Sequence, residues 1–289
     1  MMSRQFLFHS RFWLILPITI FAVLIASLSK AQTSNNTLAA INGSVIDCHP
    51  ANKIPIFLAQ EGAGISELPS YQKNKNQIRL YIKSNLSAKT NFFSDLSEAG
   101  HAITVHGNVH VHQVTSIGGY TAMNFDGDGD YLSITDKDDW NFGKDDFTID
   151  LWLIFADRGD LYDGIFSTYN RNGKDGYWLY MYDGTMHWAS LDIGLVNTGF
   201  SSAPGKWTHI AVVRHGDTLT IYVDGKARVS KNCSKLSFNS SDGVLVFGRL
   251  FTGLDGWYFK GDMDGIMVTK GIARWTDNFT PPESHKPNF

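Results

Sequence analysis

The sequence predicts an all-β protein built as a two-sheet antiparallel sandwich. Short runs rich in β-branched and aromatic residues follow one another from Ile78 almost to the end of the 289-residue chain, with Gly, Asp and Asn between them. That spacing is typical of β-sandwiches and barrels. Two Asp-Gly pairs separate alternating runs, as tight hairpins require. Beyond residue 31, no helical periodicity longer than about two turns competes with the strands.

Residues 1–31 are typical of a secretory signal peptide. A basic start without acidic residues leads into an apolar run, Phe12–Leu28, and then into small residues that end at Ala31. The run is at the short limit for crossing a bilayer and contains Pro17, so we expect cleavage after Ala31 and a secreted or cell-surface protein. An uncleaved N-terminal single-pass membrane anchor is the alternative.

Charge and cysteine content narrow the class of protein. The net charge is −3, and without residues 1–31 the chain has 22 basic against 28 acidic residues, a net −6. Nothing in this balance favours a nucleic-acid partner. Cys48 and Cys233 could pair in an oxidising compartment but cannot form a disulfide framework, so stability must come from burial. The number of copies that assemble stays open.

The chain divides into four parts. We expect residues 32–77 to be a linker or loosely packed extension, because Pro50, Pro55 and Pro69 interrupt any regular element. Residues 78–283 form the expected sandwich domain, and residues 284–289 form a C-terminal tail.

The hairpins follow from turn chemistry. Asp183-Gly184 separates GYWLYMY from TMHWASL, and Asp224-Gly225 separates TLTIYV from KARVS. Both pairs tolerate the positive φ angles of tight turns, so each marks an antiparallel hairpin. The other expected strands are Tyr120–Phe125, Tyr131–Ile134, Phe147–Phe155, Gly164–Tyr169, Trp207–Arg214, Val244–Phe247 and Phe259–Thr269.

Four phrases in order resemble the strand signatures of one family. These are FDGDGDYLSI, FTIDLWL, KWTHIAVVRHGDTLTIYVDG and GIARWTDNFTPP. They resemble the laminin-G-like jelly-roll domains of the concanavalin-A-like lectin/glucanase superfamily, over about Ile78 to Pro282. The resemblance implies two curved sheets whose concave face and rim loops bind glycans, other proteins or calcium in relatives. It also implies that Trp152 and Trp207 pack in the core. One fold of this kind hosts lectins, adhesion modules and glycosidases.

An acidic loop is a candidate calcium site. Asp126, Asp128 and Asp130 alternate with glycine, as at the start of an oxygen-rich calcium loop. The EF-hand pattern then fails, because Tyr131 replaces its glycine and Lys137 replaces its bidentate glutamate. The alternative is a tight turn between two strands, which the family usually places here.

Asp262 and Asp264 lie two apart in an expected strand, so both carboxylates leave one face about 7 Å apart. They could form a glycosidase acid/base pair or contribute calcium ligands at an edge. The glucanases of the superfamily carry a Glu-x-Asp-x-x-Glu strand motif, and FTIDLWL offers only Asp150. We therefore expect carboxylates that are solvated or hydrogen-bonded to a neighbouring loop, and no catalysis.

Histidines alternate with valines near the start of the domain. His110 and His112 share a strand face and could form half of a transition-metal site, with His101 or His106 as a further ligand. Solvated strand histidines are the alternative.

Aromatic residues beside Gly-rich turns are the candidate ligand platform, since sugar rings stack on flat side chains while carboxylates bind their hydroxyls. Packing in the core or at the rim is the alternative. The candidates, with two nearby aspartates, are Trp178, Trp188, Trp257, Tyr258, Asp183 and Asp255.

The sequence contains neither a Gly-x-Ser-x-Gly elbow nor a Gly-rich phosphate loop before a helix. We therefore expect a non-catalytic binding module for a carbohydrate or glycoconjugate, with a glycan or surface glycoprotein as partner and calcium as an optional ion. An adhesion protein that uses the sandwich for protein contacts is one alternative. A polysaccharide hydrolase is the other.

Overall fold

The chain forms two compact units, Met1–Gly64 and Ile65–Phe289. The computed structural model describes residues 38–41, 44–47, 74–84, 91–114, 120–156, 162–170, 174–251 and 256–282. In the first unit, β1 (Leu38–Ile41) pairs antiparallel with β2 (Ser44–Asp47), so the expected linker contains a two-stranded sheet. The signal peptide, Cys48 and the tail 284–289 lie outside the described residues. Within the described ranges, no helix has the length and apolar character that a membrane crossing requires.

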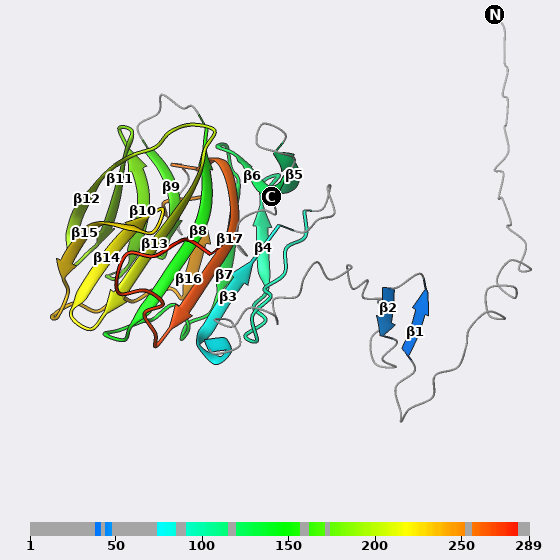
Figure 1. Ribbon diagram of the computed structural model, residues 1–289, viewed down its shortest axis with the longest axis horizontal. Coiled ribbons are helices and arrows are strands. Elements are labelled where there is room, and N and C mark those ends of the chain that lie inside the picture. The colour runs from blue at the N-terminus through cyan, green and yellow to red at the C-terminus, as the bar shows by residue number, and fades with distance from the viewer. Residues whose placement is uncertain are drawn as a thin grey trace, which may run out of the picture. The chain divides into compact units, whose positions relative to one another are not determined.

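The second unit is a sandwich of two antiparallel sheets, which confirms the expected fold class (Figure 1). The seven-stranded sheet contains, in spatial order, β12 (Gly194–Ser201), β11 (Thr185–Ser190), β10 (Tyr177–Tyr182), β9 (Tyr162–Ser167), β16 (Val244–Phe247), β7 (Tyr131–Thr135) and β4 (Ile103–His106). The eight-stranded sheet contains β15 (Lys226–Asn232), β14 (Thr218–Val223), β13 (Trp207–His215), β8 (Phe147–Phe155), β17 (Lys260–Lys270), β6 (Tyr120–Asp126) and β5 (His110–Val114), with β3 (Ile78–Ile82) also paired to β17.

Strand β17 is the centre of the eight-stranded sheet although it comes last in the chain. It lies between β8 and β6, and its second half pairs with β3 as well. The short η2 turn (Lys75–Gln77) leads into β3. Strands β8 and β16 have the bounds expected from the sequence, whereas β9 starts and ends two residues earlier than expected.

Both expected hairpins are confirmed. Asp183 and Asp224 each have φ of 48°, and Gly184 and Gly225 have φ of 69° and 71°. Two consecutive left-handed residues are what a two-residue type I′ turn requires. The first turn joins β10 to β11 and the second joins β14 to β15.

The core lies between the sheets and is rich in aromatic rings. Phe142 stacks on Phe147 with ring centroids 4.3 Å apart, and Tyr177 stacks on Trp188 at 5.8 Å. The Tyr177 hydroxyl donates to the Trp140 carbonyl at 3.1 Å, whereas the buried Trp188 Nε1–H has no hydrogen-bond partner among the described residues. Close packing of such rings supplies the burial that a chain with few cysteines needs.

The C-terminal segment, residues 271–282, covers the outer face of β13 and β14 (Figure 1). Trp275 and Phe279 stack at 3.9 Å and pack with the buried Tyr222. Nearby, Asp150 is fully buried and contacts both the His209 Nε2 atom, at 3.2 Å, and the Arg274 guanidinium. Asp150 is therefore one member of a buried charged group.

Trp152 is buried, as expected, but neither Trp152 nor Trp207 lies in the core between the sheets. Their strand neighbours Leu151, Leu153 and Phe155 fill that core. Because side chains alternate along a strand, the two indoles point to the outer face instead. Trp152 is buried there beside the His209 ring, and Trp207 is half-buried against Ile154.

Candidate functional site

The structure separates the aromatic candidates of the sequence. Trp188 is fully buried in the core between the sheets, so it cannot contact a ligand at the surface. Trp178 and Trp257 belong to a cluster on the outer face of the seven-stranded sheet. Asp183 is exposed in the β10–β11 turn, and Asp255 lies outside the described residues.

Three rings form a stack on this outer face. Tyr162 on β9 lies opposite Tyr182 on β10, and their ring centroids are 4.7 Å apart. Trp257 stacks almost parallel on Tyr162, at 4.1 Å with an interplanar angle of 8°. Tyr182 is 38% exposed and Trp257 is 39% exposed, so this stack reaches solvent.

The stack continues into three further rings. Phe251 lies 4.8 Å from Trp257 and 5.6 Å from Tyr169, and Tyr169 stacks on Trp178 at 4.4 Å. Six rings therefore touch in one unbroken row. We call the set the aromatic face: Tyr182, Tyr162, Trp257, Phe251, Tyr169 and Trp178.

Gly164 explains how the segment that carries Trp257 reaches this sheet. Its N–H donates to the Trp257 carbonyl at 3.0 Å, and a Cβ at Gly164 would overlap the backbone of Leu250. Only glycine leaves room for that crossing. Trp257 itself has φ of 59°, a strained value for a large side chain. Strain of this kind clusters at ligand sites and switch regions.

Hydroxyl groups accompany the rings. Burial raises the pKa of Tyr180 and of Tyr162, and the neighbouring Tyr182 phenol raises both further. Three phenols are thus close enough to influence one another. His187 is almost buried beside Tyr180, and burial lowers its pKa, which favours the neutral ring. Asn197 follows on β12, exposed and opposite His187.

Tyr258 belongs to a second cluster on the same sheet. The Arg249 guanidinium lies 4.7 Å above the Tyr131 ring and 5.5 Å from the Tyr258 ring. On the other side, His106 stacks on Tyr131 at 3.9 Å. Burial, and then the Arg249 charge, lower the pKa of His106. The cation and the rings satisfy one another, which makes this cluster a packing element.

In the acidic loop, the carboxylates of Asp126 and Asp130 accept hydrogen bonds from backbone N–H groups and do not converge on one point. Asp130 is fully buried and accepts the backbone N–H of Asn108 at 2.6 Å and that of Asp126 at 2.9 Å. Asp126 in turn accepts the N–H of Asp128. A Cβ at Gly107 would overlap the Asp130 carboxylate. The loop thereby fixes the point where the chain passes from β4 in one sheet to β5 in the other. Calcium binding here stays a prediction.

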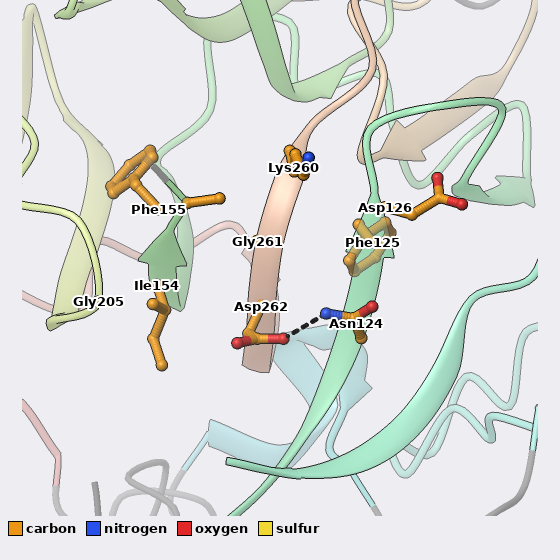
Figure 2. Close-up of a pocket in the computed structure, with 10 residues that line it drawn as sticks. Asn124, Phe125, Asp126, Ile154, Phe155, Gly205, Lys260, Gly261 and Asp262 are labelled. Atoms are coloured by element: carbon orange, nitrogen blue, oxygen red, sulfur yellow. Dashed lines mark hydrogen bonds between the residues drawn. The ribbon is translucent and has the colours of Figure 1, made fainter. Parts of the chain in front are cut away.

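Asp262 and Asp264 lie on β17 in different surroundings. Asp262 is 8% exposed, and its Oδ1 atom accepts from His112 at 2.7 Å and from Asn124 at 2.9 Å. Asp264 is fully buried, and its Oδ1 atom accepts the N–H of Ser84 at 2.6 Å. Only Asp262 lines a hollow on the outer face, so the two carboxylates do not share one cleft (Figure 2).

The histidines serve as hydrogen-bonding groups. His110 is exposed and bonds to the Asn108 carbonyl, and His112 bonds to Asp262. Among the described residues, the one trio of metal-ligating side chains within mutual reach is His101, Asp136 and Asp139. There, the two nitrogens of the imidazole face different carboxylates, and Arg79 already pairs with Asp139. The hydrogen bond between His101 and Asp139 and the Arg79–Asp139 ion pair account for this trio.

Comparison with known families adds a decisive observation. A family model described as the concanavalin A-like lectin/glucanases superfamily, of laminin-G type, matches residues 126–273, which is just over half of the chain. The chain belongs to this superfamily. The resemblance carried by the four phrases is therefore confirmed. The matched part begins at the acidic loop and includes β17.

Solved structures share the fold of this superfamily member. The binding domain of Paraclostridial Mosquitocidal Protein 1 is 16% identical with a TM-score of 0.52, covering 68% of this chain and 49% of that one. The botulinum neurotoxin serotype D ligand binding domain in complex with N-acetylneuraminic acid is 15% identical with a TM-score of 0.52, covering 71% and 50%. The botulinum neurotoxin serotype G binding domain is 13% identical with a TM-score of 0.51, covering 70% and 49%. The chain spans about half the length of these domains, and the likeness establishes the fold.

Proposed function

We propose that this protein is a non-catalytic module that binds a carbohydrate chain along the aromatic face, outside the cell or at its surface. The observation that carries the proposal is the unbroken row of six rings on one outer face, with Tyr182 and Trp257 each about two-fifths exposed. The extracellular location rests on residues 1–31.

The chemistry of the aromatic face suits a sugar chain. A pyranose presents C–H groups on one face and hydroxyls around its edge, so it needs an apolar surface bordered by hydrogen-bonding groups. The rings supply the surface. The phenols of Tyr162 and Tyr182 and the exposed side chains of Asn197 and Asp183 supply the border. Rigid aromatic side chains lose little conformational entropy on binding.

The structural neighbours support a binding role. Each is named as a binding domain, and one of them is a complex with N-acetylneuraminic acid. The surroundings of the β17 carboxylates argue against hydrolysis, since a glycosidase needs two carboxyl groups that both reach the scissile bond. Asp264 is fully buried and accepts the Ser84 N–H, whereas Asp262 lines a hollow that Asp264 does not reach.

Binding to a panel of polysaccharides, with Trp257→Ala and Tyr182→Ala, tests the proposal. We expect each substitution to weaken binding about tenfold or more, because each removes an exposed ring worth about 1.4 kcal/mol or more of contact. The matched control is Phe92→Ala. Phe92 is 71% exposed and lies outside the aromatic face, so its loss leaves affinity unchanged. Unaltered binding by the first two variants, or no binding by the folded wild-type protein, would refute the proposal.

A protein partner is the second candidate, and two exposed aliphatic side chains favour it. Leu195 is 59% exposed and Leu191 is 44% exposed, both at the β11–β12 end of the same sheet. Aliphatic side chains contribute to protein interfaces but offer no flat surface for a sugar ring. A Leu195→Ser variant that keeps glycan binding while Trp257→Ala loses it would favour the carbohydrate over the protein partner.

A further inference from the structure

A hollow of about 420 Å³ opens on the outer face of the eight-stranded sheet, on the opposite side of the sandwich from the aromatic face. It crosses the adjacent ends of β6, β17 and β8 (Figure 2). We call it the Asp262 hollow. Its volume is near the lower limit for small-molecule sites, which suits a ligand of one ring.

Hydrogen-bonding groups converge on one side of the hollow. The Asp262 Oδ1 atom is held by Asn124 and by His112, which fixes the carboxylate plane. The second carboxylate oxygen points away from Asn124, toward the side where Ile154 lies (Figure 2). Among the described residues, no donor bonds to that oxygen or to the Asn124 amide oxygen. Asp262, a residue that is 8% exposed, therefore presents one oriented acceptor, and the partly buried Asn124 presents a second.

The opposite side of the hollow is apolar. Ile154 lines it and packs against Trp207 and Ala122 in a small outer cluster. The end of β8 is closed by a loop, because the Gly205 N–H donates to the Phe155 carbonyl at 3.0 Å. A ligand here meets aliphatic carbon on one side and acceptors on the other.

The hollow is lined by charges of both signs. Asp126 and Lys260 lie opposite each other at its outer end, and His112 donates to Asp262. An anion would meet two carboxylates, and a cation would meet Lys260. A neutral ligand with hydroxyl donors avoids both costs. We infer that the Asp262 hollow is a separate binding site for a single neutral pyranose, whose adjacent hydroxyls donate to Asp262 and Asn124 while its C–H face lies on Ile154.

Titration of the full-length protein with methyl glycosides of glucose, galactose and mannose tests this site. We expect low-millimolar binding of at least one of them, as a one-ring ligand with few contacts allows, and none of glucuronic acid or glucosamine at the same concentrations. Asp262→Asn keeps the Oδ1 acceptor for His112 and Asn124 but turns the second oxygen into a donor. We expect it to weaken binding about tenfold or more.

Two controls at residues outside both proposed sites accompany this variant. Asp145→Asn makes the same chemical change at an exposed position before β8, and Phe92→Ala removes an exposed ring; neither should change monosaccharide affinity. In NMR spectra of the unmodified protein, the sugar should shift the Asn124 side-chain amide signals and leave the Trp257 indole signal in place. No neutral sugar bound, equal binding by Asp262→Asn, or shifts at Trp257 alone would overturn the inference, whatever the outcome for polysaccharides.

Discussion

Asp264 is a carboxyl group that folding places where water cannot reach it. Its Oδ2 atom is buried and, within the described residues, has no hydrogen-bond partner. Burial raises the pKa of Asp264 from 3.8 to about 7, although the Ser84 N–H and the Lys83 charge oppose the rise. Below pH 3.8 the carboxyl is protonated in both the folded and the unfolded chain. As the pH rises toward 7, the unfolded chain releases its proton first, so folding loses stability.

Replacing Asp264 by Asn should remove this pH dependence. The amide still accepts from Ser84 but never becomes charged. We expect the free energy of unfolding of Asp264→Asn to match that of the wild type near pH 4. It should exceed the wild-type value by about 4 kcal/mol at pH 8. Urea denaturation at pH 4, 6 and 8 measures the difference. Asp128→Asn, at an exposed loop position, should run parallel to the wild type. A difference that does not vary with pH would contradict the assignment.

At the scale of elements, the two Asp-Gly hairpins provide a matched pair of sites. Gly184 and Gly225 have nearly the same φ, but a Cβ at Gly184 meets nothing within 4 Å, whereas a Cβ at Gly225 would overlap the Phe279 carbonyl. We expect Gly184→Ala to cost about 1–2 kcal/mol, the penalty of a left-handed Ala. Gly225→Ala should cost clearly more and expose Trp275 to solvent. Urea unfolding and tryptophan fluorescence compare the two variants. Equal losses in the free energy of unfolding would mean that the C-terminal segment does not pack against the second turn.

The hairpins and the bounds of β8 and β16 could be predicted because turn chemistry and side-chain alternation are local. The pairing register that the Asp183-Gly184 turn imposes on β10 and β11 also predicts which face of the sheet Trp188 occupies. A two-residue turn at Asp183-Gly184 pairs Trp188 with Leu179, one residue out of step with Trp178. Trp188 therefore shares the core face. Tyr182 could have been found by alternation from Trp178 in YWLYMY.

Other parts of the site depend on contacts between distant segments. Nothing local in the sequence indicates that Trp257 crosses Gly164 to stack on Tyr162, or that His112 meets Asp262 from 150 residues away. The buried role of Asp130 likewise requires the Asn108 turn to lie beside it. Alternating aspartates occur both in metal-binding loops and in loops whose carboxylates accept backbone hydrogen bonds. Only the three-dimensional contacts distinguish the two.

At the scale of the whole molecule, residues 271–282 complete the sandwich. A chain that ends at Lys270 exposes the outer face of β13 and β14 and leaves the buried Asp150 without Arg274. Breaking a buried ion pair by removing one partner typically costs about 3–5 kcal/mol, and the lost apolar cover adds to it. We expect such a chain to melt at a much lower temperature and to bind a hydrophobic dye.

Circular dichroism melting and dye fluorescence measure the effect of that truncation. A chain that ends at residue 282 retains the segment and is the control. Equal melting temperatures for the two chains would show that residues 271–282 do not stabilise the sandwich.

The position of β17 also constrains how the protein is made. A ribosome that has completed residues 1–259 has supplied every other strand of the sandwich, yet the eight-stranded sheet is still in separate pieces, since β8, β6 and β3 all pair with β17. The apolar strands of the nascent chain must wait for that last strand, exposed to aggregation or held by a chaperone. Contacts of such long sequence separation make folding slow, so the unpaired strands stay exposed for longer.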